Sequence, residues 1–188
     1  VKVNSTDERY VNRSILINSN GGIVAWYDKI HMFDVTLSDT ESYQESKHYQ
    51  QGKHAVLAQT PWANIGLTIC YDLRFAGLYR TLAKSGAQIL TVPAAFTCPT
   101  GEAHWHTLIK SRAIETGCFL IASAQTGEHP GSNRKTYGHS LIVNPWGEVI
   151  LDGGKLPGLF FAKLDLREVK SARNRIPSLS DNSEFKIR

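Results

Sequence analysis

Short apolar segments of strand length alternate with segments of helical periodicity along this chain, and this alternation limits the folds that it can adopt. Residues 75–85 and 103–115 carry apolar side chains along one side of a helix, and residues 166–173 form a shorter segment of the same kind. Apolar runs of strand length are found at residues 13–18, 23–27, 55–59, 65–69, 88–92, 118–124, 139–143, 148–151 and 159–164. Alternating strands and helices predict a layered α/β domain.

Tight turns indicate that the sheets are mixed rather than purely parallel. Asn20-Gly21-Gly22 joins the first two predicted strands, and Asn-Pro-Trp-Gly at residues 144–147 joins a later pair, so each pair is predicted to form a hairpin. Residues 28–53 are polar and lack a sustained period, which predicts a long loop with one helical turn. A loop of that length in a compact domain is more often functional than idle.

Length and composition indicate an ordinary globular protein. A chain of 188 residues can bury a substantial core, and we expect residues 1–188 to form a single domain. The sequence has neither a run of about 18 apolar residues that would cross a bilayer nor the residue order of a signal peptide, so no membrane partner is expected. The net charge of +4 is spread among acidic residues, which argues against a nucleic-acid partner. Three cysteines without a small-domain disulfide spacing predict reduced thiols and a cytoplasmic location.

Cys70 occupies the most distinctive position in the chain. The apolar strand at residues 65–69 leads directly into it, and a helix follows a few residues later. A nucleophile on such a turn projects from the end of a sheet, and the backbone N–H groups after it, first that of Tyr71, can bind a developing oxyanion. The alternative is a buried structural cysteine, which is the commoner fate of this residue type.

The histidines do not indicate a metal site or a papain-like pair with Cys70. His31, His104, His106 and His139 all lie outside papain-like local signatures. His104 and His106 are two positions apart on a predicted helix and point to different sides, and no Cys-x-x-Cys pair supports them. We therefore expect neither a bound metal nor a cofactor.

An ordered set of short motifs resembles the nitrilase superfamily of carbon–nitrogen hydrolases. Residues 27–34 read Tyr-Asp-Lys-Ile-His-Met-Phe-Asp, and residues 69–75 read Ile-Cys-Tyr-Asp-Leu-Arg-Phe. Further matches occur, in the family's order, at residues 43–46, 93–97, 100–105, 111–115, 137–140 and 144–147. The chain is most similar to the branch that contains deaminated-glutathione amidases, with ω-amidases and carbamoyl-amine hydrolases more distant.

This resemblance implies a fold, a chemistry and an active site. The fold is a four-layer αββα sandwich that usually forms homodimers. Matched by position, Cys70 is the nucleophile, Lys29 stabilises the oxyanion, and Glu45 is the second active-site glutamate. Ala94, Phe96 and Thr97 follow a predicted strand and are expected to line the substrate pocket, with the Tyr71 N–H as an oxyanion donor.

The chain departs from the family pattern before Lys29. The family places its general-base glutamate at the end of an early strand well upstream of the lysine, whereas this segment offers only Asp7 and Glu8 in a polar run. We expect the N-terminal part of the family domain, and the base with it, to be absent from this chain. A positioned base contributes about 10²–10⁴-fold to the rate, so the chain alone is expected to be a weak catalyst with an exposed sheet edge.

The expected function is hydrolysis of a small linear amide. Cys70 would form a thioester and release ammonia, and water would then release the carboxylate. The alternatives are a non-catalytic interaction module of the same fold, or another amidase of the superfamily. Without the resemblance, Lys29 and Glu45 would be read as solvated surface charges.

Overall fold

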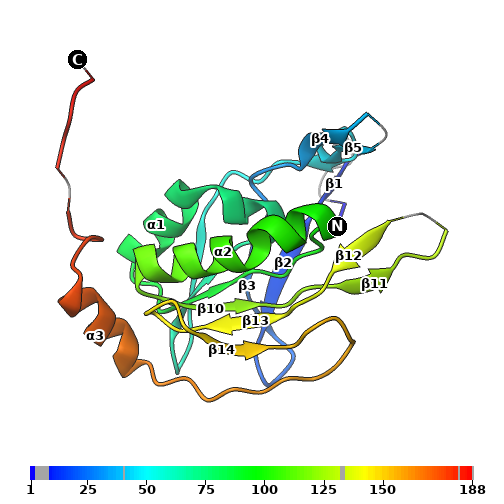
Figure 1. The fold of residues 1–188 in the computed structure, drawn as a ribbon. Helices are drawn as coiled ribbons and strands as arrows, with labels where there is room; N and C mark the ends of the chain where they lie inside the picture. The colour runs from blue at the N-terminus through cyan, green and yellow to red at the C-terminus, as the bar shows by residue number, and fades with distance from the viewer. Residues whose placement is uncertain (3–8, 40, 132–133, 182, 188) are drawn as a thin grey trace.

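A six-stranded sheet is the centre of the fold (Figure 1). The structure is a computed structural model that describes residues 1–2, 9–39, 41–131, 134–181 and 183–187. The strand order is β14-β13-β10-β9-β8-β7. In that order the strands are Val149–Asp152, Leu141–Val143, Phe119–Ala122, Ile89–Thr91, Asn64–Leu67 and Val56–Gln59. Neighbours among β8, β9 and β10 are parallel and the other pairs are antiparallel, which confirms the predicted α/β class with a mixed sheet.

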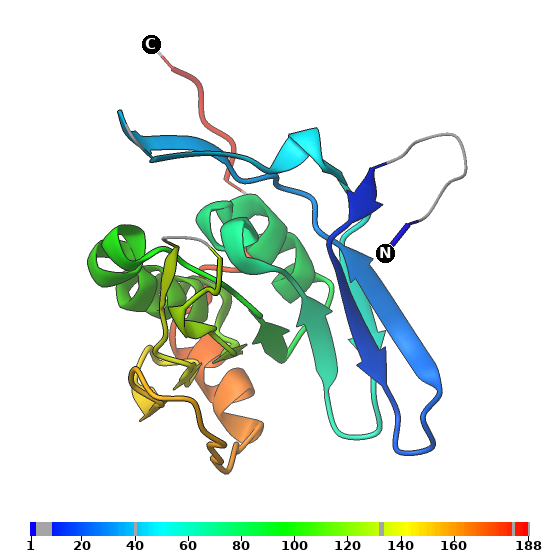
Figure 2. The ribbon, with the colours of Figure 1, turned by 90° about the vertical axis from the view of Figure 1, so that its right-hand side faces the viewer.

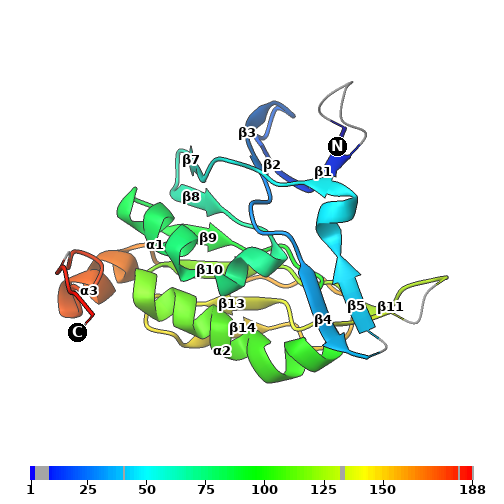
Figure 3. The ribbon, with the colours of Figure 1, turned by 90° about the horizontal axis from the view of Figure 1, so that it is seen from above.

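Two helices, α1 (Ala76–Lys84) and α2 (Cys98–Thr116), cover one face of this sheet (Figures 1 and 3). Their apolar side chains and those of the strands form the main core, which includes Leu67, Leu78, Leu82, Leu90, Trp105, Ile109, Ala113, Leu120, Leu141 and Val143. Helix α2 starts at Cys98 rather than at the predicted residue 103, because Pro99 fits the first helical turn. Gly117 ends it in the left-handed conformation, with φ +58°.

The opposite face of the sheet packs on the third helix, α3 (Arg167–Arg175). Val169 of this helix joins Ala63, Ile89 and Phe119 in a second, smaller core. Because successive side chains of a strand alternate between faces, Ile89 and Phe119 point away from the layer of α1 and α2. The strand predicted at residues 159–164 is wrong: these residues have no regular structure, and their apolar side chains are largely exposed.

Short strand pairs surround the sheet. The predicted hairpin near the N-terminus is confirmed as β2 (Arg13–Ile17) and β3 (Ile23–Asp28), which lies beside β7 (Figure 2). The loop predicted for residues 28–53 is largely wrong. It holds a hairpin of two strands, a 3₁₀ turn and a strand that pairs with β1: in order β4 (Asp34–Ser38), β5 (Glu41–Gln44), η1 (Glu45–Lys47) and β6 (Tyr49–Gln50), with β1 at Tyr10–Val11. Another hairpin, β11 (Thr126–Glu128) with β12 (Lys135–Tyr137), has no counterpart among the predicted elements.

The parallel strands converge on one edge of the sheet. Cys70 follows β8, residues 93–97 follow β9, and Gln125 follows β10. In open α/β sheets ligands bind beyond the carboxyl ends of the strands, so this edge is the natural place for a site.

Many large apolar side chains outside α1 and α2 are exposed. They include Ile15, Ile17, Ile23, Val24 and Trp26 of the β2–β3 hairpin, Val149 and Ile150 of β14, and Leu156, Leu159 and Phe161 after it. Patches of this extent usually mark a surface that another chain or segment covers. Among the described residues, no helix combines the length and apolarity that crossing a bilayer requires.

Candidate active site

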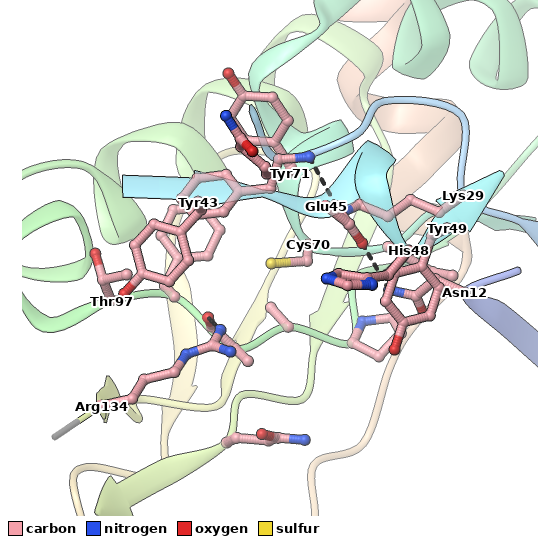
Figure 4. A pocket seen from close by; sticks show the side chains of 18 of the residues that line it. Asn12, Lys29, Tyr43, Glu45, His48, Tyr49, Cys70, Tyr71, Thr97 and Arg134 are labelled. Carbon is pink, nitrogen blue, oxygen red and sulfur yellow. Dashed lines mark hydrogen bonds and ion pairs between the residues drawn. The ribbon is translucent and has the colours of Figure 1, made fainter. Parts of the chain in front are cut away.

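A cavity of about 1060 Å³ opens beyond the carboxyl ends of β8, β9 and β10. All of the predicted site residues line it: Lys29, Glu45, Cys70, Tyr71, Ala94, Phe96 and Thr97. In Figure 4 the sulfur of Cys70 points into the space between Lys29 and Glu45 on one side and Thr97 and Arg134 on the other. Asp7 and Glu8, the acidic residues of the polar run near the N-terminus, lie outside the described residues.

Cys70 is held on a strained turn. It follows the end of β8, starts the 3₁₀ turn η2 (Cys70–Arg74) and has φ +49°, a conformation that residues other than glycine rarely adopt. Its N–H donates to Pro93 O at 2.9 Å, which fixes the turn to the segment after β9. Strain of this kind persists only where the surrounding structure enforces it, as at many functional sites.

Burial raises the pKa of the Cys70 thiol. The charge of Lys29 and the Ala95 N–H act in the opposite direction, because both favour the thiolate. Glu45 raises the pKa further, and Arg134 lowers it. Burial therefore favours the neutral thiol over the thiolate, and the charges of Lys29 and Arg134 oppose this effect.

Lys29 is only 2% exposed and forms an ion pair with Glu45. Its backbone is also fixed, because Lys29 N donates to Asn12 O at 2.9 Å and Gly52 N donates to Lys29 O at 2.8 Å. Burying an ammonium group is costly unless a partner compensates its charge. The pair therefore accounts for a lysine that is buried rather than solvated.

Glu45 begins the turn η1, and both of its carboxylate oxygens are bound. Oε2, the atom paired with Lys29, also accepts from Phe33 N at 2.7 Å, while Oε1 accepts from Asn12 Nδ2 at 3.2 Å (Figure 4). Asn12 thus touches both members of the pair. Sequence reasoning missed this residue because it lies between two short strands and outside the motifs that carry the resemblance.

A buried carboxylate connects the lysine segment to the turn of Cys70. Asp72 is fully buried and accepts hydrogen bonds from Tyr27 Oη at 2.7 Å, His31 Nδ1 at 2.7 Å and Ile69 N at 2.8 Å. Arg74, two residues further along, lies over the rings of Tyr71 and Phe96.

The far wall of the cavity comes from the hairpin that the sequence did not predict. Arg134 precedes β12, and its guanidinium lies 5.5 Å from the centre of the Tyr43 ring and 3.5 Å from Ala95 O. Lys47, His48 and Tyr49 line the wall on the other side. Arg134 and Lys47 therefore give the cavity lining positive charge. Neither residue belongs to the motifs that carry the resemblance.

Comparison with known proteins assigns the chain to a family. The sequence model of the family described as carbon-nitrogen hydrolase matches residues 2–174. The deaminated glutathione amidase of Yersinia enterocolitica is 46% identical over 170 residues, which are 90% of this chain and 59% of that protein. The deaminated glutathione amidase of Homo sapiens is 42% identical over 171 residues, which are 90% of this chain and 52% of that protein. The chain thus spans little more than half the length of these relatives.

Solved structures agree. The NitFhit protein of C. elegans superposes with a TM-score of 0.87 at 39% identity, over 94% of this chain and 43% of that one. Saccharomyces cerevisiae Nit3, a member of branch 10 of the nitrilase superfamily, gives 0.81 at 30% identity, over 93% of this chain and 60% of that one. The predicted nitrilase-type fold and the resemblance to the deaminated-glutathione amidase branch are confirmed, and the chain belongs to the carbon–nitrogen hydrolase family.

Proposed function

We propose that the protein containing this chain is a cysteine-dependent amidase, with Cys70 as nucleophile and Lys29 and Glu45 as its active-site partners. One observation carries the proposal: a thiol on a strained turn and a buried Lys29–Glu45 ion pair line the same cavity at the carboxyl ends of parallel strands. A nucleophile, a fixed cation and a carboxylate are the groups that amide hydrolysis requires.

The reaction begins with attack of the Cys70 sulfur on the amide carbonyl. A C–S bond forms as the thiol proton passes to a base, and the carbonyl oxygen becomes an oxyanion. Lys29 and nearby N–H groups, with Tyr71 N–H as first candidate, stabilise that charge. The nitrogen takes up the proton and leaves as ammonia, and water then hydrolyses the thioester to the carboxylate.

The scheme also needs a base that takes the thiol proton of Cys70. Because the pKa of Cys70 is raised, removal of its proton has to accompany the attack. Glu45 already accepts hydrogen bonds from Phe33 and Asn12 and pairs with Lys29, which suits a positioning role. The general base is therefore assigned to the glutamate that the resemblance places upstream of residue 1.

The positive charge of Arg134 and Lys47 in the cavity lining favours an amide substrate that also carries a carboxylate. Arg134 faces Cys70 across the cavity (Figure 4). Lys47 also lines the cavity. Guanidinium groups bind carboxylates in a planar, bidentate manner. Relatives bear the name deaminated glutathione amidase, which makes glutathione-like amides the first substrates to assay.

Ammonia release from a panel of amides tests the proposal. In the full-length protein, Cys70→Ala should abolish release, whereas Cys98→Ala, which alters another free cysteine outside the cavity lining, should retain it. Lys29→Met should lower kcat by about 10²–10³-fold if it supplies an oxyanion donor. Retained release by Cys70→Ala would refute the assignment of the nucleophile.

A second assay tests the substrate class. Arg134→Met should raise KM for a carboxylate-bearing amide and leave KM for a neutral amide such as propionamide unchanged. Equal effects on both substrates would contradict a carboxylate-binding role for Arg134.

We further propose that the protein works as a homodimer in a reducing, cytoplasm-like compartment. The exposed apolar side chains of the β2–β3 hairpin and β14, together with the three free cysteines, support this. Sedimentation analysis of the full-length protein should give twice the chain mass, and a monomer at micromolar concentration would contradict it.

A further inference from the structure

Three potential metal ligands that are far apart in the sequence meet outside the active-site cavity. His106 lies on α2, His139 lies between β12 and β13, and Asp152 ends β14. One ligand atom from each lies within 4.8 Å of the other two. None of the three lines the cavity that holds Cys70, so this cluster has no part in the proposed amidase chemistry.

Direct contacts show that the three side chains face one another. His106 Nε2 lies 3.0 Å from Asp152 Oδ2, and His139 Nδ1 lies 2.9 Å from Asp152 Oδ1. The two imidazole rings are 5.2 Å apart between their centres. The side chains are 35%, 19% and 35% exposed for His106, His139 and Asp152, so an ion in solution can reach them.

The backbone around His139 holds its ring in place. This residue has φ +56°, which is rare for a residue other than glycine. His139 N donates to Gly154 O at 2.7 Å, and the buried Trp105 donates from Nε1 to His139 O at 2.7 Å. The ring also stacks on Tyr137, with 4.5 Å between centres. Such outer contacts are what orient a histidine that binds a metal.

The Asp152 carboxylate is the common partner of both histidines and presents one oxygen toward each. Gly154 N donates to Asp152 Oδ1 at 2.9 Å and leaves a lone pair on each oxygen free for an ion.

We propose that His106, His139 and Asp152 form a binding site for a divalent transition-metal ion of the zinc class. Two imidazole nitrogens and one carboxylate oxygen are a ligand set that zinc accepts in three positions, with a fourth left for water. Imidazole ligands favour Zn²⁺, Cu²⁺ and Ni²⁺ over Mg²⁺ and Ca²⁺, which prefer oxygen. Ligand atoms around a tetrahedral zinc are about 3.3 Å apart. Each histidine nitrogen therefore needs to move from Asp152 by only a few tenths of an ångström, whereas the two imidazole nitrogens, in a set of atoms that spans up to 4.8 Å, have to approach each other. On binding, the ion takes the place of the proton on each ring nitrogen that faces Asp152. That proton passes to solvent, and each imidazole binds the ion as a neutral ring with a proton on its other nitrogen.

An ion at this site would link the helix layer to the edge of the sheet. His106 belongs to the helix layer, whereas Asp152 belongs to the edge strand of the sheet (Figure 3). An ion bound to both stabilises the folded chain, because the unfolded chain does not hold the three ligands together.

Co²⁺ titration followed by visible absorption tests the proposal directly. The full-length protein carrying Cys70→Ser is used, so that the active-site thiol cannot bind the probe. One equivalent of Co²⁺ should give the intense bands of a four-coordinate site, and Zn²⁺ should displace it while Mg²⁺ should not. The same chain should melt at a higher temperature with Zn²⁺ than with Mg²⁺.

Ligand variants locate the ion. His106→Ala, Asp152→Asn and His139→Asn, the last chosen because asparagine tolerates positive φ, should each weaken Co²⁺ affinity by more than the roughly 10–100-fold that loss of an outer partner costs. His104→Ala, on the same helix, is the matched control and should bind as tightly as the parent. Circular dichroism confirms that each variant is folded.

The proposal is overturned if the parent gives no four-coordinate spectrum, or if His106→Ala and Asp152→Asn bind Co²⁺ as tightly as His104→Ala does. Neither result bears on amide hydrolysis, because His106, His139 and Asp152 do not line the cavity of Cys70.

Discussion

Tyr27 donates its hydroxyl proton to Asp72 at 2.7 Å, and this contact joins the segment of Lys29 to the turn of Cys70. Both side chains are fully buried. The same hydroxyl accepts from Ile30 N at 3.1 Å. Tyr27 therefore fixes the backbone just after Lys29 through its hydroxyl and belongs itself to the backbone just before Lys29. The distance between the buried ammonium and the sulfur is consequently set by groups that do not line the cavity.

Removal of that hydroxyl should destabilise the fold. Tyr27→Phe leaves the Asp72 carboxylate and the Ile30 N–H each short of a buried partner, which typically costs about 1–3 kcal/mol. Urea unfolding measures the free energy of unfolding. Tyr10→Phe makes the same chemical change at an exposed position and should alter stability little. Equal stability of the two variants would show that the hydroxyl contributes nothing.

The same variant should also slow the enzyme. If Tyr27 positions Lys29, Tyr27→Phe in the full-length protein should lower kcat and leave KM nearly unchanged, because the cavity lining is intact. The hydroxyl itself does not titrate in the working range, since burial and the nearby Asp72 raise the pKa of Tyr27. A change confined to KM would contradict a positioning role.

Alkylation of Cys70 should depend on pH in a way that its neighbours control. Because burial raises the pKa of this thiol, its rate with iodoacetamide should still be rising above the ordinary thiol pKa of about 8.5. Lys29 lowers that pKa, so Lys29→Met should move the profile to higher pH. Glu45 raises it, so Glu45→Gln should move the profile to lower pH.

Mass spectrometry of the labelled peptides gives the rates, with Cys98 in the same sample as an internal reference. The buried Cys118, whose pKa is likewise raised by burial, should label only when the chain unfolds. Shifts of the same sign in the Lys29 and Glu45 variants would contradict the electrostatic account.

Gly52 is a position where a methyl group has no space. A Cβ there would meet Asp28 O at 2.0 Å, and Gly52 N donates to Lys29 O, so Gly52→Ala has to displace the backbone that carries the lysine. We expect a loss of about 1–3 kcal/mol in the free energy of unfolding. Gly77→Ala is the matched control, because nothing lies within 4 Å of its Cβ and alanine favours the helix by up to about 1 kcal/mol. Equal melting temperatures for the two variants would contradict this reading.

The sequence predicted the centre of the molecule well because its segments carry strong periodic signals. The two strands before Cys70 and the helix that became α1 are apolar on one side and bounded by turn residues. The ordered motifs then placed Lys29, Glu45 and Cys70 in one cavity, although periodicity alone predicted only a loop for the first two.

Elements without an apolar face were not predictable in this way. The hairpin of β11 and β12 is rich in Gly, Pro, Asn and charged residues, so it resembles a loop, and Arg134 was missed with it. The strand at residues 159–164 failed for the opposite reason. Its apolar residues lie exposed instead of pairing with the sheet, so an apolar run was mistaken for a strand.

Arg173 should stabilise the packing of α3 on the body of the protein. Its Nη2 donates to Ala87 O at 2.7 Å and its Nε donates to Thr116 O at 3.0 Å, at the ends of two different segments. Arg173→Met retains the apolar stem but leaves both carbonyls without this donor, and we expect a loss of about 1–3 kcal/mol in the free energy of unfolding. Arg167→Met is the control on the same helix, since Arg167 is exposed and pairs only with Asp165 among the contacts that the structure gives for it. Urea unfolding of both variants should separate them clearly. If Arg173→Met is as stable as Arg167→Met, the two carbonyls must be satisfied by water and the helix is held by Val169 and its apolar neighbours alone.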